Sequence, residues 1–174
     1  MEGDMDTDRQ RWIDKNELSE LVSVLASAVD RFDRDRIVSC YTEDSLDDHG
    51  LFKGSGRAFA DYICDSGFFT FMHHLIGQSV FELDVEGRQA WGETYFTFQG
   101  GVASTVVTGC GRYVDYFVRV DGAWKLKYRR VVPDLSPAGD DHGAYWAARR
   151  DGHDPSYDRP TGPDRDAPDD QRKV

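Results

Sequence analysis

Residues 71–78, FMHHLIGQ, mark the point where the pattern of the chain changes from helical to alternating. From Met72 onward, four segments are rich in the β-branched and aromatic residues that favour strands. They are QSVFELDV (78–85), AWGETYFTFQ (90–99), ASTVVTGCGRYVDYFVRV (103–120) and AWKLKYRRVV (123–132). Turn sequences separate them at 85–88, 99–102 and 120–123, and Asp121–Gly122 is the strongest hairpin signal. This half of the chain is predicted to form an antiparallel meander.

The same stretch holds two adjacent histidines, His73 and His74, beside apolar residues. An unperturbed histidine titrates near neutrality, so an imidazole in an apolar cavity can accept or donate a proton at physiological pH. Many histidines in proteins are merely half-buried and hydrogen-bonded, and this alternative stays open. A function read from this sequence starts from one of these two side chains.

The residues before this stretch predict three helices. The first is expected to begin at a cap formed by Asp14 or Asn16, after a flexible lead-in at residues 1–13, and to end near Asp30. Its apolar residues recur at helical spacing and form one stripe: Leu18, Leu21, Val22, Leu25 and Val29. A helical wheel places Asp30 beside this stripe, so its carboxylate is expected at the rim of the core.

A second, short helix is predicted to carry Ile37, Val38, Cys40 and Tyr41, and a third to begin after Ser55 and end at Gly67. The segment between them, TEDSLDDHG (42–50), is predicted to be a polar loop. Its aspartates and His49 have the chemistry of divalent-ion ligands, but adjacent ligands in an acidic turn are usually solvated, and no HxH or HExxH pattern completes a set. No metal site is therefore predicted.

Helices followed by an antiparallel meander predict an α+β protein, with the helices packed against one face of a curved sheet. Residues 14–135 are expected to form a single domain, because 174 residues suffice for one core and are few for two. After Leu135 the composition shifts to Asp, Arg, Gly and Pro, which predicts a largely disordered tail at 136–174. Alternatively, Tyr145, Trp146 and Tyr157 fold back over the mouth of a cavity.

Composition restricts the possible partners. The net charge of −11 opposes binding to phosphate backbones or anionic lipid, so neither nucleic acid nor a membrane is predicted. Three widely spaced cysteines indicate neither a disulfide framework nor a thiolate metal site, and they fit a reducing cytoplasm. No apolar run approaches the ~20 residues of a spanning helix, and the acidic start lacks the apolar centre of a signal peptide. Gly-rich nucleotide motifs and GxSxG are absent, so no cofactor is predicted.

The order of these features resembles the SnoaL-like family of the nuclear-transport-factor-two-like superfamily, over roughly residues 14–135. The resemblance rests on a helix with a late Asp, the DDHG segment, a histidine before a strand, and then ETY, GRYVDYF and DGAWKLKYRRVV. It implies a cone of curved sheet closed by helices around a deep pocket. The superfamily includes scytalone dehydratase, a bile-acid dehydratase, a hexachlorocyclohexane dehydrochlorinase, polyketide cyclases and formaldehyde-releasing lyases.

The resemblance also implies a catalytic pair. Asp30 matches the carboxylate at the end of the family's helix, and His74, four residues before Gln78, matches the general base of an HxxGN-like segment. His73 then points the other way. A carboxylate on one ring nitrogen would fix the tautomer of His74 and stabilise the imidazolium formed when the other nitrogen removes a proton.

Six further side chains are candidates for binding the substrate: Tyr41, His49, Tyr95, Tyr113, Asp115 and Arg129. The resemblance places the last three at pocket-facing positions. Tyr95 or Tyr113 could donate a hydrogen bond to a leaving oxygen or an incipient enolate. Arg129 could offset developing negative charge in a water-poor cavity, whereas strand alternation puts Arg130 on the opposite face.

The predicted function is that of a cofactor-independent lyase for a small hydrophobic, aromatic or polycyclic substrate, acting by dehydration, dehydrohalogenation or retro-aldol loss of formaldehyde. The alternatives are an isomerase or cyclase with the same base, a non-catalytic ligand-binding or oligomerising domain, and the β subunit of a ring-hydroxylating oxygenase. A homodimer or homotrimer through the outer sheet face is expected, because Trp91, Tyr116 and Trp124 supply more aromatic surface than one small cone can bury.

Overall fold

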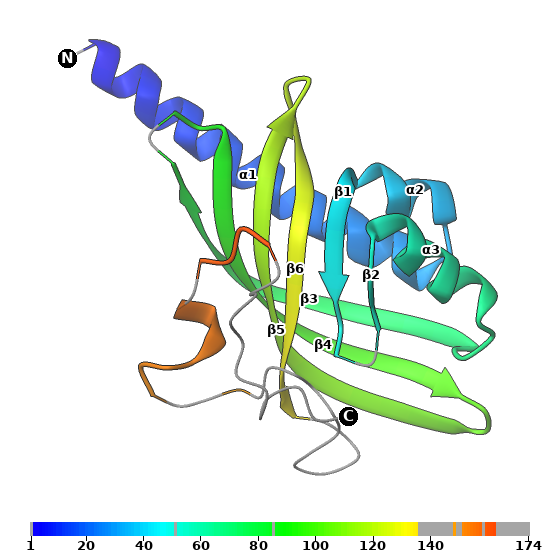
Figure 1. Cartoon of the computed structure of the whole chain (residues 1–174). Helices are drawn as coiled ribbons and strands as arrows, with labels where there is room; N and C mark the ends of the chain where they lie inside the picture. The colour runs from blue at the N-terminus through cyan, green and yellow to red at the C-terminus, as the bar shows by residue number, and fades with distance from the viewer. Residues whose placement is uncertain are drawn as a thin grey trace.

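Three helices lie against one face of a strongly bent sheet (Figure 1). The computed structural model describes residues 2–50, 52–84, 86–135, 148, 151–157 and 159–162. The helices are α1 (Glu2–Asp30), α2 (Arg34–Ser39) and α3 (Gly56–Asp65), followed near the C-terminus by the 3-10 turn η1 (Pro155–Tyr157). The strands are β1 (Tyr41–Asp48), β2 (Lys53–Gly54), β3 (Phe71–Leu83), β4 (Gln89–Val102), β5 (Thr105–Val120) and β6 (Ala123–Leu135). The predicted α+β class is confirmed.

The strands follow the order β2-β1-β6-β5-β4-β3, and every neighbouring pair is antiparallel except β1 and β6, which run parallel. The β5–β6 hairpin turns at Asp121 and Gly122, whose positive φ values of 51° and 83° suit the tight turn that this dipeptide predicts. In Figure 1 the far ends of β3, β4 and β5 sweep round beneath α3. The sheet therefore curves toward the helices.

The turn between β4 and β5 lies after Val102, so the prediction of a turn at residues 99–102 is wrong. Gly100 and Gly101 suggest a turn in the sequence, but both are paired strand residues. A Cβ on Gly100 would come within 2.5 Å of the ring of Phe98, and one on Gly101 within 2.7 Å of Phe71. These glycines are explained by the close approach of aromatic rings to the backbone.

Helix α1 begins at Glu2, well before the predicted start near Asp14 or Asn16, so residues 2–13 belong to the helix and not to a separate lead-in. Asp14 is buried and pairs with Arg119 of β5 instead of capping the helix. The predicted apolar stripe does face the core, where four of its residues are buried: Leu18, Val22, Leu25 and Val29.

The end of the predicted second helix and the predicted polar loop form strand β1 instead. Helix α2 ends at Ser39, and Tyr41 begins a strand that pairs with β6. Asp47 and Asp48 are both fully buried on this strand, and Asp48 pairs with Lys53 at 2.9 Å. Pairing with β6 and these side-chain partners override the loop propensity of the acidic residues.

Helix α3 begins as predicted, with the hydroxyl of Ser55 accepting a hydrogen bond from the backbone N–H of Ala58 at 3.2 Å. Its first residue, Gly56, lies directly against the side chain of Tyr41, and its backbone N–H donates to the Ser45 hydroxyl at 3.1 Å. The start of α3 is therefore held against β1.

Gly56→Ala should lower the free energy of unfolding by about 1–3 kcal/mol, the usual cost of overpacking. An added Cβ would lie 2.2 Å from the ring and 2.6 Å from the Cβ of Tyr41, so α3 or β1 would have to shift. Chemical denaturation measures the difference. Gly152→Ala is the control, because a Cβ there meets nothing within 4 Å. Equal stability of both variants would contradict the close packing of α3 on β1.

The described part of the C-terminal segment packs on the outer face of the sheet. Asp154 is buried and accepts two hydrogen bonds from Arg112 of β5, at 2.7 and 3.0 Å. The hydroxyl of Ser156 lies 3.2 Å from the same guanidinium, and Arg159 pairs with Glu82 of β3. This ion-paired contact differs from the solvated coil predicted for residues 136–174.

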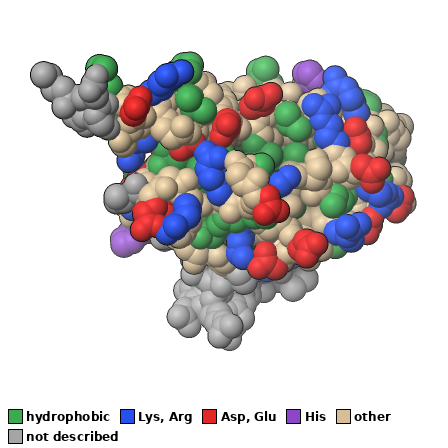
Figure 2. Space-filling view, turned by 90° about the horizontal axis from the view of Figure 1, so that it is seen from above, with side chains coloured by type: hydrophobic (Ala, Val, Ile, Leu, Met, Phe, Trp, Pro, Cys, Tyr) green, Lys and Arg blue, Asp and Glu red, His purple; other side chains and the backbone are tan. Residues whose placement is uncertain are grey.

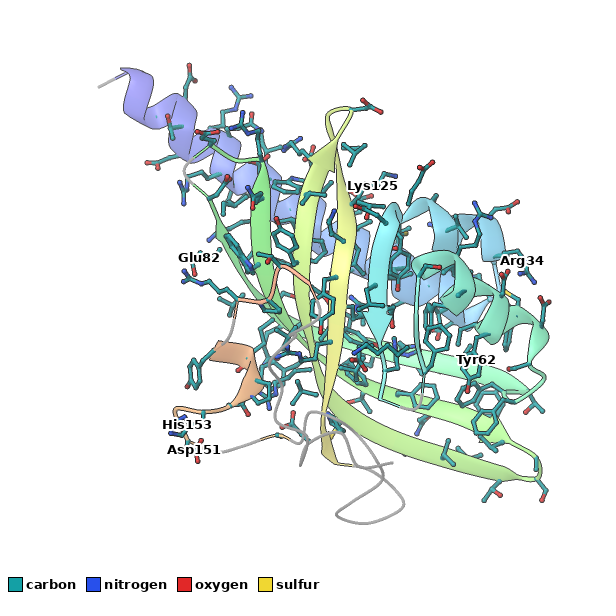
Figure 3. The ribbon with its side chains drawn as sticks, viewed as in Figure 1. Arg34, Tyr62, Glu82, Lys125, Asp151 and His153 are labelled. Atoms are coloured by element: carbon teal, nitrogen blue, oxygen red, sulfur yellow. The ribbon has the colours of Figure 1, made fainter. Side chains whose placement is uncertain are left out.

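The described C-terminal residues do not cover the helical side of the sheet. Figure 3 shows Asp151 and His153 in this segment, far from α3 and Tyr62. Of the three aromatic residues predicted to fold over a cavity, Tyr157 is exposed in the segment, and the other two lie outside the described residues. Residues 136–147, 149–150, 158 and 163–174, on which the rest of the predicted tail falls, also lie outside them.

The acidic composition does not produce a single negative field on the upper face. Figure 2 shows Lys and Arg side chains interspersed with Asp and Glu over this face, with hydrophobic side chains between them. None of the helices in the described ranges combines the length and the apolar character needed to cross a membrane.

Candidate active site

A cavity of about 230 Å³ lies between the helices and the curved sheet. Its wall is mostly aromatic and aliphatic and includes Val29, Phe52, Phe59, Tyr62, Ile63, Phe68, Phe69, Met72, Phe96, Phe98 and Val131. Beside these, His49, His74 and Tyr113 bring polar atoms to the wall. An apolar chamber with a few placed polar groups is typical of a small-molecule site.

His74 is fixed by Asp30, the last residue of α1. Its Nδ1 donates to Asp30 Oδ1 at 2.6 Å, and its backbone N–H donates to Oδ2 of the same carboxylate at 2.9 Å. Within the described residues, Nε2 of His74 makes no hydrogen bond, so this nitrogen is the one left to face the cavity. The neighbouring His73 is exposed on the outer face, as strand alternation predicts.

The contacts with His74 also keep Asp30 ionised. Burial by itself raises the pKa of the Asp30 carboxyl, but the hydrogen bonds from the His74 ring and backbone outweigh it, and the pKa is lowered overall. A carboxylate at this position favours the tautomer with the proton on Nδ1. The basic lone pair then lies on Nε2.

His49 is held by a second carboxylate, Asp47. Its Nδ1 contacts Asp47 Oδ1, and the hydroxyl of Tyr41 donates to the other oxygen, Oδ2, at 2.5 Å. The imidazole stacks on Phe59, with ring centroids 4.6 Å apart and planes inclined by 15°. Burial and the neighbouring Asp47 raise the pKa of Tyr41 well above its ordinary value, so its phenol stays protonated.

Tyr113 lies between an aromatic ring and a cation. It stacks on Phe96 with centroids 4.2 Å apart, and the guanidinium of Arg129 lies 3.8 Å from its ring centroid. Burial raises the pKa of Tyr113 above its ordinary value. The hydroxyl is therefore a neutral hydrogen-bond donor at physiological pH.

Arg129 does not reach the cavity wall but lies behind Tyr113, paired with Asp115. Its Nε and Nη2 donate to the two oxygens of Asp115 at 2.8 and 2.7 Å, and both side chains are buried. Burial favours a neutral side chain, but the charge and hydrogen bonds of Asp115 raise the pKa of Arg129 overall. The Tyr113 ring thus separates Arg129 from the cavity, and neither Arg129 nor Asp115 is part of the cavity wall.

Tyr95 is the candidate that lies on the outer face of the sheet, away from the cavity. Its side chain is 43% exposed on the outer face, near the guanidinium of Arg112. In the β4–β5 register Thr94 pairs with Tyr113 and Tyr95 with Arg112, so the two tyrosines point to opposite faces. Tyr113 alone is the tyrosine of this predicted pair that reaches the cavity.

The two carboxylates of the acidic DDHG segment do not converge on one point. Asp47 contacts His49, whereas Asp48 contacts Lys53 and the backbone N–H of Gly50. Among the residues that the structure describes, no three His, Cys, Asp or Glu side chains are arranged to hold a metal ion. The role of Asp47 in positioning His49 was not predicted. Its sequence signal is the alternation that puts Asp47, His49 and Tyr41 on one side of a strand.

Comparison with known proteins identifies the family to which this chain belongs. The family model that describes the SnoaL-like domain matches residues 10–130 of this chain. The chain belongs to the SnoaL-like family. Its architecture is accordingly that of the nuclear-transport-factor-two-like superfamily, as the sequence resemblance implies. A search of the curated proteins finds no match to this SnoaL-like chain.

Several solved structures share the SnoaL-like fold at low identity. A provisionally assigned scytalone dehydratase from Novosphingobium aromaticivorans has a TM-score of 0.69 and 18% identity, covering 80% of this chain and 95% of that one. The type-3 hexachlorocyclohexane dehydrochlorinase LinA from Novosphingobium barchaimii has a TM-score of 0.67 and 18% identity, covering 74% and 92%. A Mycobacterium tuberculosis protein of unknown function has a TM-score of 0.65 and 22% identity, covering 75% and 77%. At these identities the similarity establishes the fold.

Proposed function

We propose that this SnoaL-like protein is a cofactor-independent lyase that uses His74 as a general base on a small aromatic substrate. The observation that carries the proposal is the 2.6 Å contact between His74 Nδ1 and Asp30, which leaves the second ring nitrogen for an apolar cavity. A positioned base of this kind contributes about 10²–10⁴-fold to a proton transfer. The fold is shared with proteins named as a dehydratase and a dehydrochlorinase, which supports elimination as the reaction class.

In the proposed reaction, Nε2 of His74 removes a proton from a carbon beside a carbonyl group. The C–H electron pair forms a double bond and expels the leaving group from the next carbon. Tyr113 donates a hydrogen bond to the carbonyl oxygen, where negative charge develops, and Arg129 stabilises that charge from behind the tyrosine ring. His49 completes the polar side of the cavity. Tyr41 and Asp115, both predicted to bind the substrate, lie behind the wall, where Tyr41 is bonded to Asp47 and Asp115 to Arg129. Retro-aldol cleavage needs the same base, acting on a hydroxyl group instead.

The size of the cavity favours one aromatic ring over a polycycle. A cavity of about 150 Å³ is enough for benzene, and the volume here is about 230 Å³. The remaining space suits a short side chain that carries the carbonyl and the leaving group. We therefore propose a substituted monocyclic aromatic compound as the substrate class.

A β-hydroxy ketone with a phenyl group on the hydroxyl-bearing carbon tests this function. Dehydration gives a conjugated enone and retro-aldol cleavage gives benzaldehyde, so ultraviolet absorbance and chromatography identify the reaction. We expect enzyme-dependent formation of one of these products, and its loss in His74→Gln. A protein that binds the ketone without converting it or any related aryl ketone would be a ligand-binding module instead.

We also propose a reducing cytoplasm as the location. All three cysteines, Cys40, Cys64 and Cys110, are free thiols. Free thiols persist where glutathione and thioredoxin systems operate, which supports this location.

We expect a homodimer or homotrimer in light scattering at micromolar concentration. Two of the aromatic residues predicted to drive association are covered within the chain, since Trp124 is 5% exposed and Tyr116 hydrogen-bonds Gln89 at 2.7 Å. Other apolar side chains of the strands remain exposed and supply the surface: Phe71, Leu75, Val80 and Val106. Leu75→Lys should weaken assembly, with Ser19→Lys, at an exposed position of α1 away from the outer face of the sheet, as the control for added charge. A monomeric wild-type mass would contradict this expectation.

A further inference from the structure

The cavity contains a second imidazole held by a carboxylate, which the base-catalysed step does not use. His49 and His74 both line the cavity, and each contacts one member of the stacked pair formed by Tyr113 and Phe96. The centroid of His49 lies 6.4 Å from Tyr113, and that of His74 lies 6.4 Å from Phe96. A substrate ring placed over this stacked pair would have one imidazole near each end.

The buried side chains around His49 include more carboxylates than permanent cations. The buried groups that face it are Asp47 and Tyr41 on β1, Asp115 and Tyr113 on β5, and Arg129 on β6. Tyrosines are neutral here, so the group contains two carboxylates and one guanidinium. Both donors that Arg129 directs at a carboxylate go to Asp115. The His49 ring is therefore the group in contact with Asp47 that can carry a compensating positive charge.

The hydrogen bonds of His49 show which of its ring nitrogens can give a proton to a bound molecule. Nδ1 of His49 is engaged by Asp47, whose second oxygen is occupied by the Tyr41 hydroxyl. Nε2 of His49 makes no hydrogen bond within the described part of the chain, and the ring lines the cavity. The proton on Nε2 is therefore the one that a bound molecule can receive.

We propose that His49 is the general acid of the lyase reaction, with Asp47 and Tyr41 as its positioning residues; the inference rests on the proposed function. His74 Nε2 takes the proton from the carbon beside the carbonyl, and the C–H electron pair becomes the new double bond. The C–O bond breaks with its electron pair on the hydroxyl oxygen, which takes the Nε2 proton of His49 and leaves as water. The proton on His74 then passes through solvent to His49, so substrate gives enone and water with nothing else consumed. The two imidazoles divide the acid and base roles of one elimination.

The test compares two leaving groups in one pair of variants. The phenyl β-hydroxy ketone needs a proton on its leaving oxygen, whereas the matching β-chloro ketone expels chloride without one, and both give the same enone. We expect His49→Gln to reduce kcat with the hydroxy compound by about a hundredfold or more, while the chloro compound reacts close to the wild-type rate. His74→Gln should impair both compounds. Asp47→Asn should reproduce the selectivity of His49→Gln in a weaker form.

Each outcome is decisive. Equal losses with both leaving groups in His49→Gln would overturn the acid role while leaving the proposed lyase function in place. A wild-type enzyme that converts neither compound would overturn the proposed function and this inference with it. A second measurement, NMR of isotope-labelled histidine rings, needs no substrate. We expect a proton on each ring nitrogen of His49 at pH 7 in the wild type. In Asp47→Asn we expect the Nε2 proton to be lost. A neutral His49 ring in the wild type would overturn the inference.

Discussion

His74→Ala and Asp30→Asn should each remove most of the turnover of the phenyl β-hydroxy ketone, by about a hundredfold or more. His74 supplies the base, and Asp30 accepts two hydrogen bonds from this residue, one from the ring Nδ1 and one from the backbone N–H. Without the carboxylate the imidazole samples the other tautomer, in which Nε2 carries a proton and cannot accept one. Steady-state kinetics of the two variants measure the loss.

The double variant should be scarcely worse than the worse single variant. Asp30 has no separate role in the reaction, so once the imidazole is gone its carboxylate has nothing to orient, and the two effects are not additive. Full additivity in the double variant would show that Asp30 contacts the substrate directly.

His73→Ala is the matched control for this prediction. It removes an imidazole from the adjacent position of β3, but on the exposed outer face. Near-normal turnover and an unchanged melting temperature are expected. An inactive His73→Ala together with an active His74→Ala would show that His73, and not His74, faces the cavity.

Arg129→Ala should destabilise the fold by about 3–5 kcal/mol, because it leaves the buried carboxylate of Asp115 without its partner. The guanidinium is 4% exposed, makes two hydrogen bonds to Asp115, and covers one face of the Tyr113 ring. Truncation removes both the charge and the packing. Denaturant unfolding of the purified variant measures the change.

A variant that replaces both partners separates the charge effect from the packing effect. Arg129→Met combined with Asp115→Leu should be clearly more stable than either Arg129→Ala or Asp115→Ala, because no buried charge is then left unpaired. If the double replacement were the least stable of the three, the ion pair itself would be the source of stability. The neighbouring Arg130 is not a neutral control, since it is 0% exposed and not on a solvated face as strand alternation alone suggests.

The sequence predicts well what depends on local pattern. The Asp121–Gly122 hairpin, the Ser55 cap and the inward face of α1 all follow from spacing and side-chain chemistry. The facing of His73 and His74 also follows, because strand alternation fixes it once the strand is identified.

What the sequence does not predict depends on pairing across the fold. Strand β1 is mostly polar or charged, with Tyr41 and Leu46 as its exceptions. Its strand conformation comes from pairing with β6, more than 80 positions further along the chain in every registered pair. The buried position of Asp47, which is registered with Arg129, and the covered position of Arg129 itself come from the same pairing. The sequence around Asp154 predicts a solvated tail, because its neighbours in the chain give no sign that Arg112 lies beside it in the fold.

The wall of the cavity is divided by element. The groups with proposed chemical roles stand on α1, on β1 and just after it, at the start of β3, in the middle of β5 and on β6, whereas Tyr62, Phe68 and Phe69 stand on α3 and the loop after it. Substitutions at these aromatic positions can therefore change the shape of the cavity while leaving both imidazole–carboxylate pairs in place. Laboratory evolution toward new substrates should accumulate its substitutions at Tyr62, Phe68 and Phe69 first, and retain one reaction while the compounds it accepts diversify.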